Sequence, residues 1–130
     1  MTHPNEELVR QGYTAFGKGD MDTLRSMYAT DAVHSNAGSS PVAGEYKGVD
    51  DILGFYGQLS ERSGGTFTAE LKSAKAEGDD TVVAIHREKA QRDGKTLDQD
   101  ETLTFTISGG KITHLVDAHS DQAAYDAFWA

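Results

Sequence analysis

The chain has 130 residues, no cysteine and a formal net charge of −9 at pH 7. This length suits one domain with a single substantial core, and we expect residues 1–130 to form it. The lack of cysteine excludes disulfides and thiolate chemistry, and the lack of any basic run argues against nucleic acid or an anionic membrane surface as a partner.

The N-terminal half of the chain shows helical periodicity in three segments. Pro4 and the two acidic residues that follow favour a helix start, and the pattern predicts a helix over 4–16, before two closely spaced glycines. Asp20 is expected to cap a short second helix, and a third helix is predicted over 49–62. A strand over 32–36 and a loop rich in Gly and Ser, with room for a short edge strand, separate the second helix from the third.

The C-terminal half changes from helical periodicity to alternation. The alternating segments predict strands over 66–76, 81–90, 96–107 and 111–119. Short turns rich in Gly and Asp separate them, which favours an antiparallel meander of hairpins. Asp121 then caps a last helix, whose Trp129 is expected to close the end of the fold.

Helices followed by an antiparallel sheet predict an α+β fold, with the helices packed on the concave face of a curved sheet. Such a sheet leaves a cavity at its open end, which is the natural place for a small-molecule site.

Three runs of sequence carry a family resemblance: YTAFGKGDMDTLRSMYATDAV, GEYKGVDDILGFYGQL and GGKITHLVDAHSDQAAYDAFW. In this order, over nearly the whole chain, they resemble the SnoaL-like branch of the nuclear transport factor 2-like superfamily. The resemblance implies a cone-shaped α+β fold, a deep apolar pocket and a homodimer formed through the sheet. It implies no single activity, because steroid isomerases, polyketide cyclases, dehydratases, epoxide hydrolases and proteins that only bind share this fold.

Comparison with the ketosteroid isomerases of this superfamily addresses one specific reaction, steroid isomerisation. They use a carboxylate base and an oxyanion hole made of a tyrosine and a protonated aspartic acid. By resemblance the base position is Asn36, and an amide cannot take a proton from carbon. The tyrosine position falls near Gly12, one residue from Tyr13, and one step along a helix turns a side chain by about 100°. The resemblance therefore argues against steroid isomerisation.

The same resemblance places Glu101 at the position of the protonated acid. With Glu101 at that position, its side chain shares a strand face with Leu103 and Phe105. These apolar surroundings would raise the pKa of its carboxyl. A shift of the strand by one residue would instead expose Glu101 to solvent.

Two histidines are candidates for acid–base chemistry. His34 and Asn36 are two residues apart on a strand, so their side chains should point the same way. His34 can serve as a base or donor near neutral pH, or it can bond to the backbone where the strand ends. His86 would lie beside Glu101 if its face is concave, forming an acid–base pair, or neighbours could hold it for a purely structural reason.

Four further residues are expected to contact a substrate. Asn36 would orient it through a hydrogen bond. Tyr56 lies on an inward helix face and suits a ligand hydroxyl, and Tyr13 and Val116 complete the predicted substrate-binding wall. His114 and His119 fall on opposite faces of the last strand. Because the chain also lacks cysteine and an HExxH element, we expect no metal and no other cofactor.

The sequence leaves two classes of function open. The first is a cofactor-independent enzyme that carries out isomerisation, cyclisation, dehydration or epoxide opening on a small apolar molecule, with His34, His86 and Glu101 as catalytic groups. The second is a non-catalytic module that binds a ligand or another protein, which the amide at position 36 favours. No run resembles a membrane span or a secretory signal, so we expect the protein to act in the cytoplasm.

Overall fold

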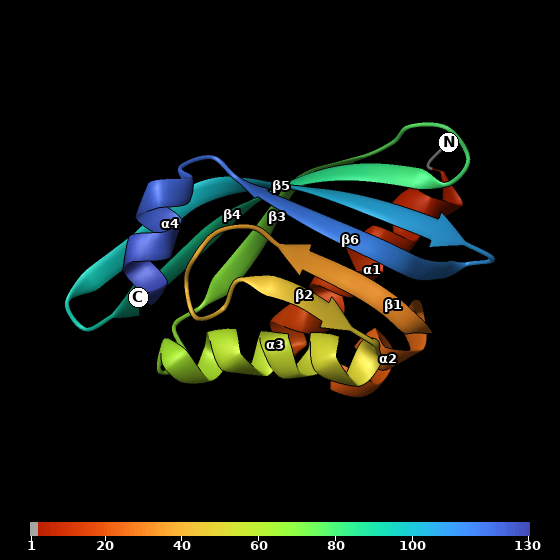
Figure 1. The fold of residues 1–130 in the computed structure, drawn as a ribbon. Helices are drawn as coiled ribbons and strands as arrows, with labels where there is room; N and C mark the ends of the chain where they lie inside the picture. The colour runs from red at the N-terminus through yellow and green to blue at the C-terminus, as the bar shows by residue number, and fades with distance from the viewer. Residues whose placement is uncertain (1–2) are drawn as a thin grey trace.

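The computed structural model describes residues 3–130 and shows helices packed on a curved, six-stranded sheet (Figure 1). In chain order the elements are α1 (Pro4–Lys18), α2 (Met21–Met27), β1 (Tyr28–Asn36), β2 (Gly44–Lys47), α3 (Val49–Arg62), β3 (Thr68–Ala76), β4 (Thr81–Arg92), β5 (Lys95–Ser108), β6 (Lys111–His119) and α4 (Gln122–Trp129). The strand order is β2-β1-β6-β5-β4-β3, with β1 parallel to β6 and all other neighbours antiparallel. Within residues 3–130, no helix has both the length and the apolarity that crossing a bilayer requires.

The predicted α+β class and the order of the elements are confirmed, but several boundaries differ by one to four residues, and two of them have a clear physical reason. Helix α1 continues to Lys18 because Gly17 faces open space and is tolerated inside the helix, and the left-handed Gly19, with φ 68°, ends it. Strand β1 begins at Tyr28 rather than at residue 32. Tyr28 is already extended, with ψ 144°, and ends the second helix.

The helices α1, α2 and α3 lie on one side of the sheet (Figure 1), and the core fills the space between them. That core includes Val9, Leu24 and Ile52 from the helices and Val82, Phe105 and Leu115 from the strands. Helix α4 packs against the end of the β4–β5 hairpin, where Arg92 and Lys95 donate to the carbonyls of its last turn at 2.9–3.2 Å. Trp129 is fully buried there, as expected for a residue that closes this end.

Two local features of the strands decide which side chains meet on the concave face. The two-residue Asp–Gly turn at 93–94 has positive φ at both positions, and its ladder places His86 directly opposite Glu101. The next hairpin has a register shift after Thr106, and the shifted ladder places Glu101 opposite His119. Residues from three adjacent strands therefore form one row across the sheet.

Candidate active site

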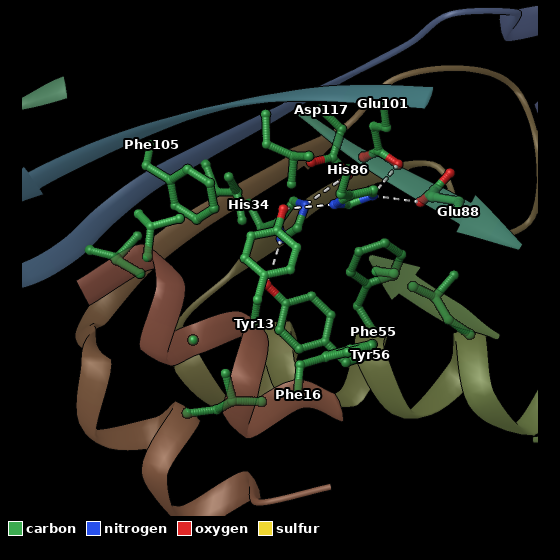
Figure 2. A pocket seen from close by; sticks show the side chains of 18 of the residues that line it. Tyr13, Phe16, His34, Phe55, Tyr56, His86, Glu88, Glu101, Phe105 and Asp117 are labelled. Carbon is green, nitrogen blue, oxygen red and sulfur yellow. Dashed lines mark hydrogen bonds and ion pairs between the residues drawn. The ribbon is translucent and has the colours of Figure 1, made fainter. Parts of the chain in front are cut away.

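A cavity of about 80 Å³ lies between the N-terminal helices and the concave face of the sheet. Its wall is mostly apolar and includes Val9, Phe16, Leu24, Met27, Leu103 and Phe105. One end is polar, and Figure 2 shows imidazole, carboxyl and phenol groups gathered there. The volume is about half that of an apolar cavity of about 150 Å³ that holds benzene, so the space as built suits a small molecule.

His86 and Glu101 meet at this polar end. Both are buried, and Nε2 of His86 lies 3.3 Å from Oε2 of Glu101. The other ring nitrogen of His86, Nδ1, lies 2.6 Å from the hydroxyl of Tyr13, which reaches across from α1. Burial, followed by the charge of Asp117, raises the pKa of Glu101 well above its ordinary value, which favours the neutral carboxyl. The inward orientation expected for both residues is present, and their catalytic role stays a prediction.

Glu88 is a second carboxyl at this end, which the sequence reasoning missed. It is only 3% exposed, and its Oε1 lies 3.4 Å from Nε2 of His86. Burial, together with the charge of Glu101, raises the pKa of Glu88 well above its ordinary value. The signal was available, because Glu88 follows His86 by two residues and must share its strand face.

His34 forms a close pair with Asp117, a residue not singled out from the sequence. Nε2 of His34 lies 2.9 Å from Oδ2 of Asp117, and both side chains are buried. Burial alone would raise the pKa of Asp117, but the charge and hydrogen bond of His34 outweigh burial and lower it. Nδ1 of His34 lies 3.2 Å from the hydroxyl of Tyr56, which in turn bonds to the hydroxyl of Tyr28 at 2.6 Å.

The phenol hydroxyls at this end all remain protonated donors at neutral pH. Burial raises the pKa of Tyr28 to about 12, although the hydrogen bond from Tyr56 partly opposes the shift. Burial also raises the pKa of Tyr13 and that of Tyr56 well above the ordinary value, and neighbouring groups add to it. Tyr13 and Tyr56 both line the cavity, as expected for substrate-binding residues.

Asn36 is a predicted substrate-binding residue that does not line the cavity. Its amide instead fixes the tautomer of His119. Its amide nitrogen donates to the carbonyl of Val42 and to the hydroxyl of Tyr125, both at 3.0 Å, so its oxygen is the remaining acceptor. That oxygen lies 2.8 Å from Nε2 of His119, which must therefore carry the hydrogen. Burial lowers the pKa of His119, so the ring is neutral and its Nδ1 keeps a lone pair. Sequence reasoning assigned neither role.

Val116 is the second predicted substrate-binding residue that lies outside the cavity. It is 51% exposed and points away from the cavity, because Leu115 and Asp117 on either side of it face inward. His114 is exposed and His119 points inward, so the prediction that these two histidines occupy opposite faces is confirmed.

Two overlapping sets of side chains lie close enough together to hold a metal ion. One is His86, Glu88 and Glu101, and the other is Glu101, Asp117 and His119, with the candidate ligand atoms of each set within 4.8 Å of one another. Glu101 belongs to both sets, because it occupies the middle of the row across β4, β5 and β6.

Comparison with known proteins shows the family. Residues 9–115 match the SnoaL-like domain family. The uncharacterized protein Rv0034 of Mycobacterium tuberculosis is 36% identical over 124 residues, which cover 95% of each chain. The structure of Bal32a from a soil-derived mobile gene cassette superimposes with a TM-score of 0.95 at 36% identity, covering 98% of this chain and 97% of that one.

A more distant neighbour shows how far the fold extends. A putative SnoaL-like polyketide cyclase from Jannaschia sp. has a TM-score of 0.80 at 18% identity, covering 98% of this chain and 92% of that one. At this identity the likeness shows the fold alone. The chain therefore belongs to the SnoaL-like domain family, on a fold that it shares with proteins named as polyketide cyclases.

Proposed function

We propose that this member of the SnoaL-like family is an enzyme that moves protons on a small, largely apolar substrate carrying one carbonyl or hydroxyl oxygen. The supporting observation is the division of one cavity into an apolar wall and a polar end where histidines, carboxyls and phenols share hydrogen bonds. The apolar wall would hold the body of the substrate, and the polar end would receive its oxygen. Solved structures with this fold include proteins named as polyketide cyclases, and those names agree with the proposed chemistry.

His34 is the proposed base. Asp117 accepts the hydrogen of Nε2 at 2.9 Å and orients the ring, as the carboxylate does in a catalytic triad. That arrangement leaves the lone pair on Nδ1, next to the hydroxyl of Tyr56 and the cavity. Nδ1 takes a proton from the carbon beside the carbonyl, and the electron pair of the C–H bond moves toward the carbonyl oxygen. Return of the proton to another carbon completes an isomerisation, and loss of a hydroxide leaving group as water completes a dehydration.

Tyr13, His86 and Glu101 form the proposed donor side. The hydroxyl of Tyr13 stays protonated because burial raises its pKa, so it can donate to the oxygen on which negative charge develops. His86 holds this hydroxyl at 2.6 Å, and Figure 2 shows the Tyr13 ring pointing from α1 toward both imidazoles. Glu101 stands behind His86, with Oε2 3.3 Å from Nε2 of the ring, and helps to hold the imidazole in place.

Hydrogen exchange tests the proposal without a known substrate. Small aliphatic ketones such as acetone and butanone are incubated with the protein in D₂O, and loss of the protons beside the carbonyl is followed by ¹H NMR. We expect the wild type to accelerate exchange of at least one ketone and His34→Gln to slow it by about 100-fold or more. His114→Gln is the matched control, because this exposed histidine lies outside the cavity.

Two results would count against the proposal. Ketones that bind in the cavity without exchange above the buffer rate would assign a binding role instead. Equal exchange by the wild type and His34→Gln would remove His34 as the base.

A further inference from the structure

Four side chains converge on the inner face of three adjacent strands: His86 and Glu88 from β4, Glu101 from β5 and His119 from β6. We propose that this four-residue cluster binds a divalent transition-metal ion, with Zn²⁺ as the best match. The inference rests on the geometry of the cluster and does not depend on the proposed proton-transfer reaction.

The spacing of the four donor groups is the first argument. Nε2 of His86 lies 3.3 Å from Oε2 of Glu101 and 3.4 Å from Oε1 of Glu88. Nδ1 of His119 lies 3.4 Å from Oε2 of Glu101 and 3.9 Å from Oε2 of Glu88. Zinc bonds of about 2.0–2.1 Å in tetrahedral geometry place neighbouring ligand atoms about 3.3 Å apart. These distances exceed those of good hydrogen bonds. The ligand atoms of His86, Glu88 and Glu101 all lie within 4.8 Å of one another, which suits three ligands of one ion, and His119 approaches the same two carboxyls as the fourth group.

The second argument concerns the ring nitrogen of each histidine that faces away from the carboxyls. In both histidines this nitrogen already forms a hydrogen bond with a side-chain oxygen. His119 donates from Nε2 to Asn36 at 2.8 Å, which leaves the Nδ1 lone pair directed at the carboxyls. Nδ1 of His86 meets the hydroxyl of Tyr13 at 2.6 Å. Metal-binding histidines usually donate their other N–H in this way, which fixes both the tautomer and the ring orientation.

The third argument is a pair of buried acceptors that lack partners. Among residues 3–130, Oε2 of Glu88 and Nδ1 of His119 have no hydrogen-bond partner, and their side chains are 4% and 0% exposed. The two atoms face each other at 3.9 Å. Two acceptors do not attract each other, and leaving them both buried and unpaired costs free energy. A cation between them gives each of them a partner.

Charge balance is the fourth argument, because a divalent ion leaves the cluster neutral. Two carboxylates, from Glu88 and Glu101, and two neutral imidazoles, from His86 and His119, would balance the charge of Zn²⁺. The nearby pair of His34 and Asp117 stays separate, because Nε2 of His34 and Oδ2 of Asp117 already meet at 2.9 Å.

Such an ion would also orient a group that faces the cavity. Coordination of Nε2 would keep the hydrogen of His86 on Nδ1, from which it donates to the oxygen of Tyr13. The hydroxyl hydrogen of Tyr13 would then be free to point into the cavity.

Zinc binding by the metal-stripped protein tests the inference. Calorimetric titration with Zn²⁺ should give one ion per chain with up to two protons released, and Co²⁺ should give the intense visible absorption of a tetrahedral site. We expect Glu88→Gln and His119→Gln each to weaken zinc affinity by at least about tenfold. His114→Gln, on the outward face of the same strand, is the matched control and should bind as the wild type does. Circular dichroism confirms that each variant is folded.

A second measurement on the wild type keeps the test decisive if a variant fails to fold. Zn²⁺ should shift the imidazole ¹⁵N resonances of His86 and His119 and leave that of His114 in place. The inference fails if the wild type shows no saturable zinc binding, if Glu88→Gln binds zinc as tightly as the wild type, or if only the resonances of exposed histidines shift. None of these readouts requires turnover, so they are independent of the proposed reaction.

Discussion

Two groups of histidines and carboxyls share the concave face of the sheet, and they differ in how closely their atoms meet. In the pair of His34 and Asp117, the nitrogen and oxygen are 2.9 Å apart, whereas the four-residue cluster has separations of 3.3–3.9 Å. Asp117, Glu88 and Glu101 are buried to a similar extent, at 2–5% exposed. Their pKa values nevertheless shift in opposite directions, downward for Asp117 and upward for the two glutamates. Burial alone therefore does not set the charge of a carboxyl, and the position of the nearest donor decides it.

The largest effect is expected from breaking the close pair. Asp117→Ala leaves His34 buried without its carboxylate, and removing one partner of a buried pair costs about 3–5 kcal/mol. Asp117→Asn keeps an oxygen acceptor and should cost about 1–3 kcal/mol. Urea unfolding at pH 7 measures both free energies. A cost below about 1 kcal/mol for Asp117→Ala would mean that the pair contributes little, and the contrast with the four-residue cluster would disappear.

The next effect concerns the cluster and depends on pH. Glu88 has an ordinary pKa of 4.5, raised well above that value in the folded protein. Above pH 4.5 the unfolded chain loses this proton while the folded chain keeps it, so stability falls as pH rises toward the raised pKa. The slope is about 1.4 kcal/mol per pH unit for one such group. In the metal-free protein, Glu88→Gln removes this contribution, and between pH 5 and pH 7 the variant should lose less stability than the wild type.

Urea unfolding at several pH values measures this difference. The matched control is Glu70→Gln, because Glu70 is exposed on β3 and should give a curve parallel to that of the wild type. A parallel curve for Glu88→Gln as well would show that Glu88 is ionised in the folded protein.

The close pair and the cluster also differ in how much of them the sequence predicts. The meeting of His86 and Glu101 follows from the two-residue turn at 93–94, because counting back from a tight turn fixes the opposite residues. Glu88 follows from the same alternation. Asp117 does not, since it meets His34 through the parallel pairing of β1 and β6, across a sequence separation of 83 residues.

A single register shift explains why Val116 points away from the cavity and His119 points toward the carboxyls. Without the shift after Thr106, the pairing at the tip of the β5–β6 hairpin would continue unchanged and place Glu101 opposite Ala118. With Glu101 opposite Ala118, Val116 would face the cavity and His119 would face outward. The structure shows the opposite orientation for both residues. No glycine or proline marks the bulge near Thr106, so it could not be predicted from the residue pattern.

The smallest effect is expected where the cluster reaches the cavity through Tyr13. Tyr13→Phe removes one hydroxyl and its 2.6 Å contact with Nδ1 of His86, which should cost about 0.5–1.5 kcal/mol in the free energy of unfolding. Tyr46→Phe is the matched control, because Tyr46 also donates one hydrogen bond, to the carbonyl of Val42 at 2.7 Å, but does not line the cavity. The two variants should therefore be similarly stable in urea and differ in ketone exchange, with only Tyr13→Phe slowed. If both exchange as fast as the wild type, the hydroxyl of Tyr13 supports His86 without donating to the substrate, and the cluster acts on the cavity through the imidazole alone.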